Sequence, residues 1–228
     1  MKRSAKTAYL IFADDPHIEA QKKIFSYAHS NPINHQVSTT LTAEICRLTR
    51  QLNYPVILVG SDKQTGASFG EKLANAFDYV FAKGYDKVIA VGNDCIGLST
   101  GILRKAADKL SINDCVYGPS ADGGCYLIGL TKKSFDKKEF ETLPWQSPEL
   151  YKSLLTHKLS NTTIYTCLPF LRDLDTEQDV YANNALNAVA RAIFNLIQRF
   201  KQLTCADCCS EIFNCCLTLF LLRAPPLV

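Results

Sequence analysis

The chain alternates short apolar runs with longer stretches in which apolar residues recur every three or four positions. Thr7–Ala13 and Val56–Val59 have the pattern of buried strands, and Lys87–Val91 supplies a third. Cys115–Gly118 and Cys125–Leu130 predict two more strands on either side of a polar loop. A further short run predicts a strand over Thr163–Leu168.

Helical periodicity fills the segments between these strands. The clearest case places Phe69, Leu73, Phe77 and Phe81 four residues apart, with Gly84 as a stop signal. Ser99 is the expected N-cap of a helix that runs to Leu110. The other helical segments are Ile18–His29, Thr42–Asn53, Pro148–Leu159 and the stretch from Thr176 to about Leu203.

Strands that alternate with helices predict an α/β fold with three layers, in which helices cover both faces of a mostly parallel sheet. The length of 228 residues, 47% of them hydrophobic, suits one domain. We expect that domain to cover residues 1–182, and a C-terminal helix with a cysteine-rich apolar tail to cover 183–228.

Charge and cysteine usage narrow the class of protein. Lys and Arg outnumber Asp and Glu by only 25 to 22 and are dispersed, which does not favour a nucleic-acid partner. The first apolar stretch, Ala8–Ala13, is shorter than the apolar region of a signal peptide. Because five of the ten cysteines crowd between Cys205 and Cys216, they do not form the framework of a secreted scaffold. These features together predict a cytoplasmic protein.

Asp94 follows the third predicted strand, in the segment Gly92-Asn93-Asp94. Ligands of open parallel sheets bind outside the carboxyl ends of the strands, where Asp94 is expected. A carboxylate there suits an oxygen-liganded divalent cation that carries phosphates. Spacing alone equally allows Asp94 to cap the following helix or a turn.

The loop Pro119–Gly124 lies between two predicted strands and ends in Asp122-Gly123-Gly124. The adjacent glycines favour a positive φ or a close approach of the backbone to a ligand. Asp122 can bind sugar hydroxyls or act as a general base, and the same residues also make an ordinary turn.

Four segments in this order resemble the rSAM/selenodomain-associated transferase family. They are Gln64-Thr65-Gly66 with Phe69–Leu73, Val91–Cys95, Gly118–Leu130, and Asp173-Leu174-Asp175-Thr176 with Asp179. The family is a group of GT-A-like glycosyltransferases related to phospholactate guanylyltransferase and the sugar nucleotidyltransferases. The resemblance implies the GT-A (nucleotide-diphospho-sugar transferase) fold.

The resemblance also implies the roles of individual residues. Asp94 and Asp175 are the implied ligands of Mg²⁺ or Mn²⁺, and Asp122 is the implied catalytic residue. The implied nucleotide-binding residues are Gln64, Gly66, Gly70 and Asn93, and Gly123 and Gly124 are the implied substrate-binding residues. The substrates would be a nucleotide-sugar donor and an unidentified acceptor.

The first loop departs from the pattern of the sugar nucleotidyltransferases, because Ala13–Lys23 contains neither glycine nor arginine. Asp14 and Asp15 would repel phosphates, although Lys22 or Lys23 can supply a positive group. This departure disfavours one alternative, nucleotidyl transfer to a small phosphorylated metabolite, and makes another credible, a nucleotide-binding protein without catalytic activity. Sugar transfer is the function that we expect.

The C-terminal segment carries an apolar helical stripe from Leu186 to Leu203, expected to pack on the domain or to form a homodimer. Ile212–Leu222 is too short to span a bilayer. For Cys208-Cys209 and Cys215-Cys216, a tail without a function ranks first, membrane or partner contact second, and zinc binding third.

Overall fold

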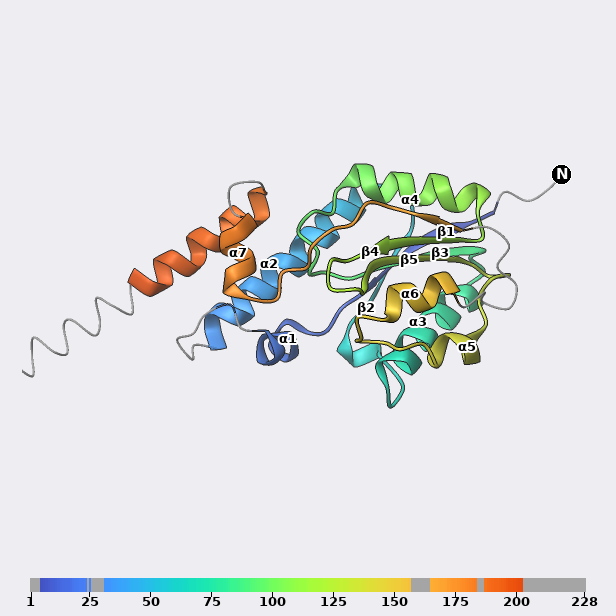
Figure 1. The fold of residues 1–228 in the computed structure, drawn as a ribbon, viewed down its shortest axis with the longest axis horizontal. Helices are drawn as coiled ribbons and strands as arrows, with labels where there is room; N and C mark the ends of the chain where they lie inside the picture. Colours follow the sequence, from blue (N-terminus) through green and yellow to red (C-terminus); the bar gives the residue numbers. More distant parts are fainter. Residues whose placement is uncertain (1–4, 24, 26–30, 157–164, 184–186, 203–228) are drawn as a thin grey trace, which may run out of the picture.

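The computed structural model describes residues 5–23, 25, 31–156, 165–183 and 187–202. A six-stranded sheet of order β2-β1-β3-β5-β4-β6 forms its centre (Figure 1). The strands are β1 (Thr7–Phe12), β2 (Val56–Val59), β3 (Lys87–Val91), β4 (Cys115–Pro119), β5 (Cys125–Thr131) and β6 (Tyr165–Cys167).

Five of the six strands run in the same direction. β1 is parallel to β2 and β3, β4 is parallel to β6, and β5 is antiparallel to both of its neighbours, β3 and β4. The predicted mostly parallel α/β sheet is therefore confirmed. Because β1 and β3 are adjacent and parallel, the loops that follow them emerge side by side at one edge of the sheet.

Helices cover both faces of the sheet (Figure 1). The cores show that α3, α5 and α6 pack on one face and that α2 and α4 pack on the other. The helices are α1 (Pro16–Lys22), α2 (Asn31–Arg50), α3 (Phe69–Ala82), α4 (Thr100–Ile112), α5 (Lys137–Glu141), α6 (Leu150–Thr156) and α7 (Glu177–Asn183), with a 3₁₀ turn at Ser61–Lys63.

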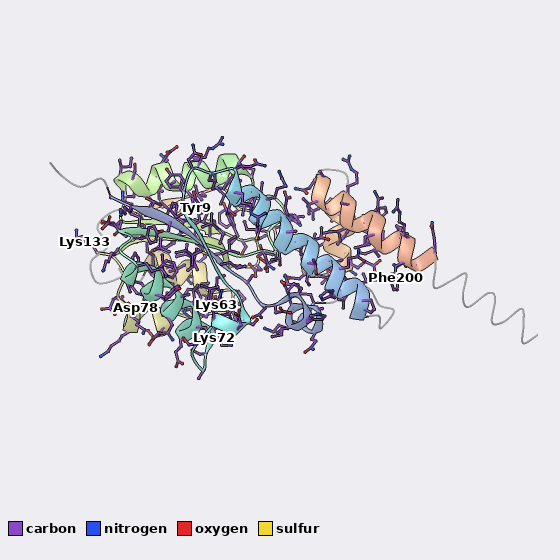
Figure 2. All side chains as sticks on the ribbon, turned by 180° about the vertical axis from the view of Figure 1, so that it is seen from behind. Tyr9, Lys63, Lys72, Asp78, Lys133 and Phe200 are labelled. Carbon is purple, nitrogen blue, oxygen red and sulfur yellow. The ribbon has the colours of Figure 1, made fainter. Side chains whose placement is uncertain are left out.

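The side chains of β1 explain why one strand serves both layers. Ala8 and Leu10 point into the core under α3, whereas Tyr9 and Ile11 point into the core under α4. Tyr9 is fully buried and its hydroxyl donates a hydrogen bond to the carbonyl of Leu103 in α4, at 2.6 Å (Figure 2). The central strand is thereby fixed to both helical layers.

A third apolar cluster lies at the end of the molecule that holds α7 and the helical residues 188–202 (Figure 1). Ile193 and Ile197 pack there against Val37 and Leu41 of α2. Figure 2 shows Phe200 on the same helix. The described part of the predicted apolar stripe, from Val189 to Phe200, thus packs on the chain's own helices, and a homodimer through it stays a prediction.

The structure differs from the predicted elements in several places, for example where α1 ends at Lys22 instead of continuing to His29. α2 begins at Asn31 instead of Thr42, because Ile33, Val37 and Leu41 extend its apolar stripe through a polar stretch of low helix propensity. β2 lies at the sheet edge, so it is not the buried strand that its apolar run predicts: Leu58 is 45% exposed. The short helix α5 has no counterpart in the predicted elements.

The predictions for the cysteine-rich tail concern residues outside the described ranges. Within those ranges, no helix is both long enough and apolar enough to cross a membrane.

Gly70 allows α3 to pack closely against the loop after α5. A Cβ atom at Gly70 would lie 2.5 Å from the Glu141 carbonyl oxygen and 2.5 Å from the ring of Trp145. Trp145 is in turn fixed by a hydrogen bond from its Nε1 to the Phe140 carbonyl, at 2.8 Å. The glycine therefore sets the position of this tryptophan.

We expect Gly70→Ala to lower the free energy of unfolding by about 1–3 kcal/mol, because the added methyl group overpacks a fixed contact. Gly101→Ala is the matched control, since Gly101 lies in helix α4 and a Cβ there would make only an ordinary contact, 3.7 Å from Ser99 Oγ. The control should leave stability unchanged or raise it by up to about 1 kcal/mol. Urea denaturation measures the free energy of unfolding of both variants. Equal changes in the two would contradict the tight contact at Gly70.

Candidate active site

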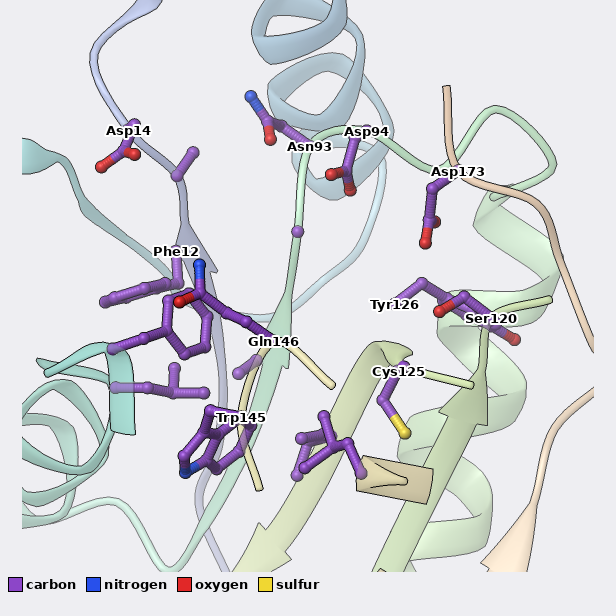
Figure 3. A pocket seen from close by; sticks show the side chains of 18 of the residues that line it. Phe12, Asp14, Asn93, Asp94, Ser120, Cys125, Tyr126, Trp145, Gln146 and Asp173 are labelled. Carbon is purple, nitrogen blue, oxygen red and sulfur yellow. The ribbon is translucent and has the colours of Figure 1, made fainter. Parts of the chain in front are cut away.

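A cavity of about 750 Å³ opens at the edge of the sheet where β1 and β3 end. Its two ends differ in chemistry (Figure 3). Three carboxylates, Asp94, Asp122 and Asp173, line one end, and the other end is lined by the aromatic rings of Phe12, Phe69 and Trp145. The volume is within the usual range of small-molecule sites.

Asp94 stands at the acidic end because β3 stops at Val91 and the chain turns there. A Cβ atom at Gly92 would lie 3.1 Å from Asp94 Oδ1, so the small residue leaves room for the carboxylate beside the backbone. The backbone also pairs with a distant segment, since the amide of Leu174 donates to the Asp94 carbonyl at 2.9 Å. Asp94 is one third exposed, which leaves it accessible from the cavity.

Residues 171–174 bring a second carboxylate to the same end. Leu171 pairs with the end of β4, where its amide donates to the Pro119 carbonyl at 3.1 Å, and Asp173 forms an isolated antiparallel bridge with Cys95. Asp173 lines the cavity, and its Oδ1 is buried without a hydrogen-bond partner. Burial, followed by the charges of Asp94 and Asp122, raises the pKa of Asp173 to about 7.

Lys23 also lines the cavity and bridges three carboxylates. Its Nζ is 3.0 Å from Asp94 Oδ2, 3.1 Å from Asp175 Oδ1 and 3.4 Å from Glu19 Oε1. The side chain is only 11% exposed. Burial alone would lower the pKa of Lys23, but Asp94, Asp175 and Glu19 together raise it, so the ammonium stays charged.

Asn93 ties the same strand end to helices α1 and α2. Its Nδ2 donates to Glu19 Oε2 at 2.8 Å and to Thr42 Oγ1 at 3.0 Å. Burial raises the pKa of Glu19, against the lowering effects of Lys23 and Asn93. Asn93 lines the cavity, but its NH₂ group is used by these protein contacts.

The first loop neutralises most of its own charge. Asp15 caps α1 by accepting a hydrogen bond from the His17 amide at 2.9 Å. Asp14 pairs with Lys22 and accepts from Ser61 Oγ at 3.1 Å. Although burial opposes it, these contacts lower the pKa of Asp14. The loop therefore presents a paired carboxylate to the cavity instead of a glycine-rich phosphate cradle.

Asp122 is held by its own loop. Its Oδ1 accepts hydrogen bonds from Ser120 Oγ at 2.6 Å and from the Gly124 amide at 2.9 Å. Gly123 has a φ of 91°, and a Cβ atom there would lie 2.1 Å from the Pro148 carbonyl oxygen. The glycine is therefore needed for the close approach of two protein segments, while Asp122 and Gly124 line the cavity.

The aromatic end is a connected set of rings. Phe69 lies 5.6 Å from Phe12 and 5.6 Å from Trp145, measured between ring centroids. Beside them the amide of Gln64 lines the cavity, but its Nε2 donates to the Ala13 carbonyl at 3.0 Å. A ring-shaped apolar ligand fits this end better than a charged one.

The predicted site residues divide into two sets. The structure brings one set together around the cavity: Gln64, Asn93, Asp94, Asp122 and Gly124. The other set does not line it: Gly66, Gly70, Gly123 and Asp175. Gly66 has a φ of 135° in the turn before α3, where a Cβ atom would lie 2.8 Å from Glu71 Cβ. Asp175 meets Asp94 only through Lys23.

Asp173 and Gln146 are among the cavity residues that were not predicted from the sequence. Asp173 belongs to the acidic motif, but the motif does not show which of its carboxylates faces the cavity. Gln146 also lines the cavity, with a φ of 57°. No sequence signal could have indicated that conformation, because glutamine has no preference for it.

Comparison with known proteins supports the fold. Residues 59–147 match the model of a family described as an uncharacterised protein conserved in bacteria, DUF2064. A crystal structure from Desulfovibrio desulfuricans, described as a candidate nucleotide-diphospho-sugar transferase, is 21% identical. The alignment covers 86% of this chain and 98% of that one, with a TM-score of 0.71. The chain therefore has the nucleotide-diphospho-sugar transferase fold, as predicted.

Other solved structures are less similar. A 4-diphosphocytidyl-2C-methyl-D-erythritol synthase from Anaerococcus prevotii is 8% identical with a TM-score of 0.46, over 80% of this chain and 96% of its own. A Mycobacterium tuberculosis protein solved with manganese is 14% identical, with a TM-score of 0.43. That alignment covers 78% of this chain and 97% of the other. No curated protein sequence matches this chain. The association with radical-SAM and selenium domains stays a prediction.

The raised pKa of Asp173 gives a pH dependence that can be measured. Between about pH 4, where an unfolded aspartate titrates, and pH 7, the folded protein holds a proton that the unfolded chain has lost. Asp173 therefore makes the protein less stable as pH rises through this window, by up to about 1.4 kcal/mol per pH unit. Asp173→Asn removes this dependence.

Urea denaturation of both proteins from pH 4.5 to 7.5, with EDTA present, tests this expectation. The free energy of unfolding of the wild type should fall relative to that of the variant as pH rises. Parallel profiles would show that Asp173 is ionised throughout and that its burial has no energetic cost.

Proposed function

We propose that this chain transfers a sugar from a nucleoside-diphosphate donor to an acceptor, with Mg²⁺ or Mn²⁺ as cofactor. The observation that carries the proposal is the division of one cavity into an aromatic end and an acidic end, in a fold shared with nucleotide-diphospho-sugar transferases. The donor is divided in the same way, into a planar base and a charged diphosphate. The fold itself suits several chemistries, so the proposal rests on the site.

The acidic end fits a divalent cation. The orphaned Oδ1 of Asp173 lies in a cluster where Asp94 and Asp122 repel its charge, and carboxylate oxygens are the ligands that Mg²⁺ and Mn²⁺ prefer. Among the described residues, no group of three His, Cys, Asp or Glu is placed to hold a metal ion by itself, so a bound ion would also need ligands from the donor. We therefore propose Asp94 and Asp173 as the protein ligands, with phosphate oxygens of the donor completing the shell. The bound ion would stabilise the charge that develops on the leaving diphosphate.

Asp175 has a different place in this proposal from the one that its motif implies. Its carboxylate contacts Lys23 Nζ and does not line the cavity. An ion placed between Asp94 and Asp175 would have to displace that ammonium. Asp175 is therefore proposed as a positioning residue, which keeps Lys23 in place and through it orients Asp94.

Asp122 is the proposed general base. Its Oδ1 is oriented by two hydrogen bonds, which fix the carboxylate at the cavity wall. An acceptor hydroxyl bound there would lose its proton to Asp122 as it attacks the sugar. A hydrogen bond to a sugar hydroxyl is the alternative role of the same carboxylate.

The first loop favours sugar transfer over nucleotidyl transfer. A nucleoside triphosphate brings more negative charge than a diphosphate donor, and the loop would present it with Asp14. Lys22 already pairs with that carboxylate, and Lys23 is surrounded by three others. Lys72 is the remaining lysine that lines the cavity, and it faces the same loop.

Product analysis separates the three candidate functions. The protein is incubated with Mg²⁺ or Mn²⁺ and a panel of nucleotide sugars, and release of the nucleoside diphosphate is measured. We expect slow, metal-dependent release, at least about 100-fold lower in Asp94→Asn, because one charge-stabilising group is worth about this factor. Pyrophosphate release from nucleoside triphosphates and sugar phosphates would instead show nucleotidyl transfer. Binding without either product would show a protein that is not an enzyme.

Two neighbouring carboxylates give a sharper test of the cation site. Asp173→Asn should weaken the apparent affinity for Mn²⁺ by about 10-fold or more, whereas Asp175→Asn should weaken it less, because Asp175 acts only through Lys23. Isothermal titration of Mn²⁺ in the presence of a nucleoside diphosphate measures both. The reverse order would favour Asp175 as the ligand.

A further inference from the structure

Gln146 has an unusual backbone conformation. Its φ of 57° lies in the left-handed region, and no other residue except glycine has a positive φ within the described ranges. This conformation costs a residue with a side chain about 1–2 kcal/mol, so it persists only where the surrounding structure requires it. Residues held in this way are frequent at ligand sites.

Fixed contacts on both sides of Gln146 impose the conformation. On one side, the Trp145 amide donates to the Leu143 carbonyl at 2.7 Å, and the ring closes on Gly70. On the other side, Pro148 lies against Gly123. Gln146 links the fixed Trp145 to the segment of Pro148, and its left-handed backbone directs the side chain into the cavity.

The amide of Gln146 is available to a ligand. Figure 3 shows it beside Phe12 and above Trp145, directed into the cavity. No hydrogen bond to its side chain exists within the described residues. The amide of Gln64, for which the family resemblance implies base contact, instead donates to the Ala13 carbonyl.

This end of the cavity does not suit the diphosphate. The first turn of α3 is closed by a capping box, in which Ser68 Oγ accepts from the Glu71 amide at 3.1 Å and Glu71 Oε2 accepts from the Ala67 amide at 2.7 Å. The cap satisfies the Glu71 amide and places the Glu71 carboxylate beside the helix start, where it would repel a diphosphate. A flat, uncharged ring with polar edges is the part of the donor that matches.

We infer that Gln146 is the residue that recognises the base of the nucleoside diphosphate and sets the base preference. This inference rests on the proposed function. A carboxamide offers one acceptor and two donor hydrogens, so it can pair with a base edge that presents both groups. Phe12, Phe69 and Trp145 would cover the faces of the base, while Asp94 remains at the phosphate end.

The test compares affinities for ADP, GDP, CDP and UDP, each with Mg²⁺, measured by isothermal titration calorimetry. Gln146→Gly keeps the left-handed backbone without strain and removes only the side chain. We expect the wild type to prefer one base and the variant to lose about 5- to 10-fold of that preference, the equivalent of one or two hydrogen bonds. The melting temperature of the variant should be almost unchanged.

Two further variants separate the possible causes. Glu149→Gln changes an exposed residue that does not line the cavity and should leave the ranking of the four ligands intact. Asp94→Ala should weaken all four by a similar factor, because it acts at the phosphate end.

Each outcome decides the inference. Wild-type binding with the same base ranking in Gln146→Gly would overturn the role of Gln146 and leave the proposed function standing. Loss of base preference in Gln64→Ala but not in Gln146→Gly would assign the role to Gln64. If no nucleoside diphosphate binds the wild type, both the inference and the proposed function are overturned.

Discussion

The site depends on one electrostatic constraint, the neutralisation of carboxylates that converge at the end of β3. Lys23 supplies a buried ammonium to Glu19, Asp94 and Asp175, and in doing so it joins α1, the β3 loop and the segment after β6. One positive charge does not balance three negative ones, and Asp173 adds a fourth with an orphaned oxygen. Glu19 and Asp173 Oδ1 are the buried members of this group, and a buried negative charge is costly unless a cation or a proton compensates it. The raised pKa of Asp173 and the proposed divalent ion are two responses to the same imbalance.

The aromatic end of the cavity is governed by packing instead of charge. Gly70 lets Trp145 close on α3, and the fixed tryptophan forces Gln146 into a left-handed conformation that directs its amide toward the ligand. Gly70 does not line the cavity, yet it determines that the Gln146 side chain does. The two ends are built by different segments, yet both depend on β1, because Phe12 ends that strand and the first loop with Lys23 follows it.

The sequence predicted the fold well because its signals are local. The apolar runs of β1 and β3, the period of α3 and the Ser99 cap all appear within a few residues of one another, and the structure confirms them. The site was harder to predict. Asp94 needed only the rule about strand ends, whereas the choice between Asp173 and Asp175 depends on a bridge to Cys95 across the fold. Gly70 and Gly123 were predicted as ligand contacts because a glycine motif does not show whether a ligand or another protein segment approaches it.

The central claim is that both ends of the cavity bind one ligand, and the single tryptophan of the chain, Trp145, allows a direct test. Its emission is followed while a nucleoside diphosphate is added with Mg²⁺ or with EDTA. We predict a saturable change in the wild type whose midpoint moves to at least about 10-fold higher ligand concentration with EDTA or in Asp94→Asn, since losing one charged contact weakens binding by this order. A tryptophan signal that is absent, or that saturates at the same concentration in all three cases, would contradict the claim.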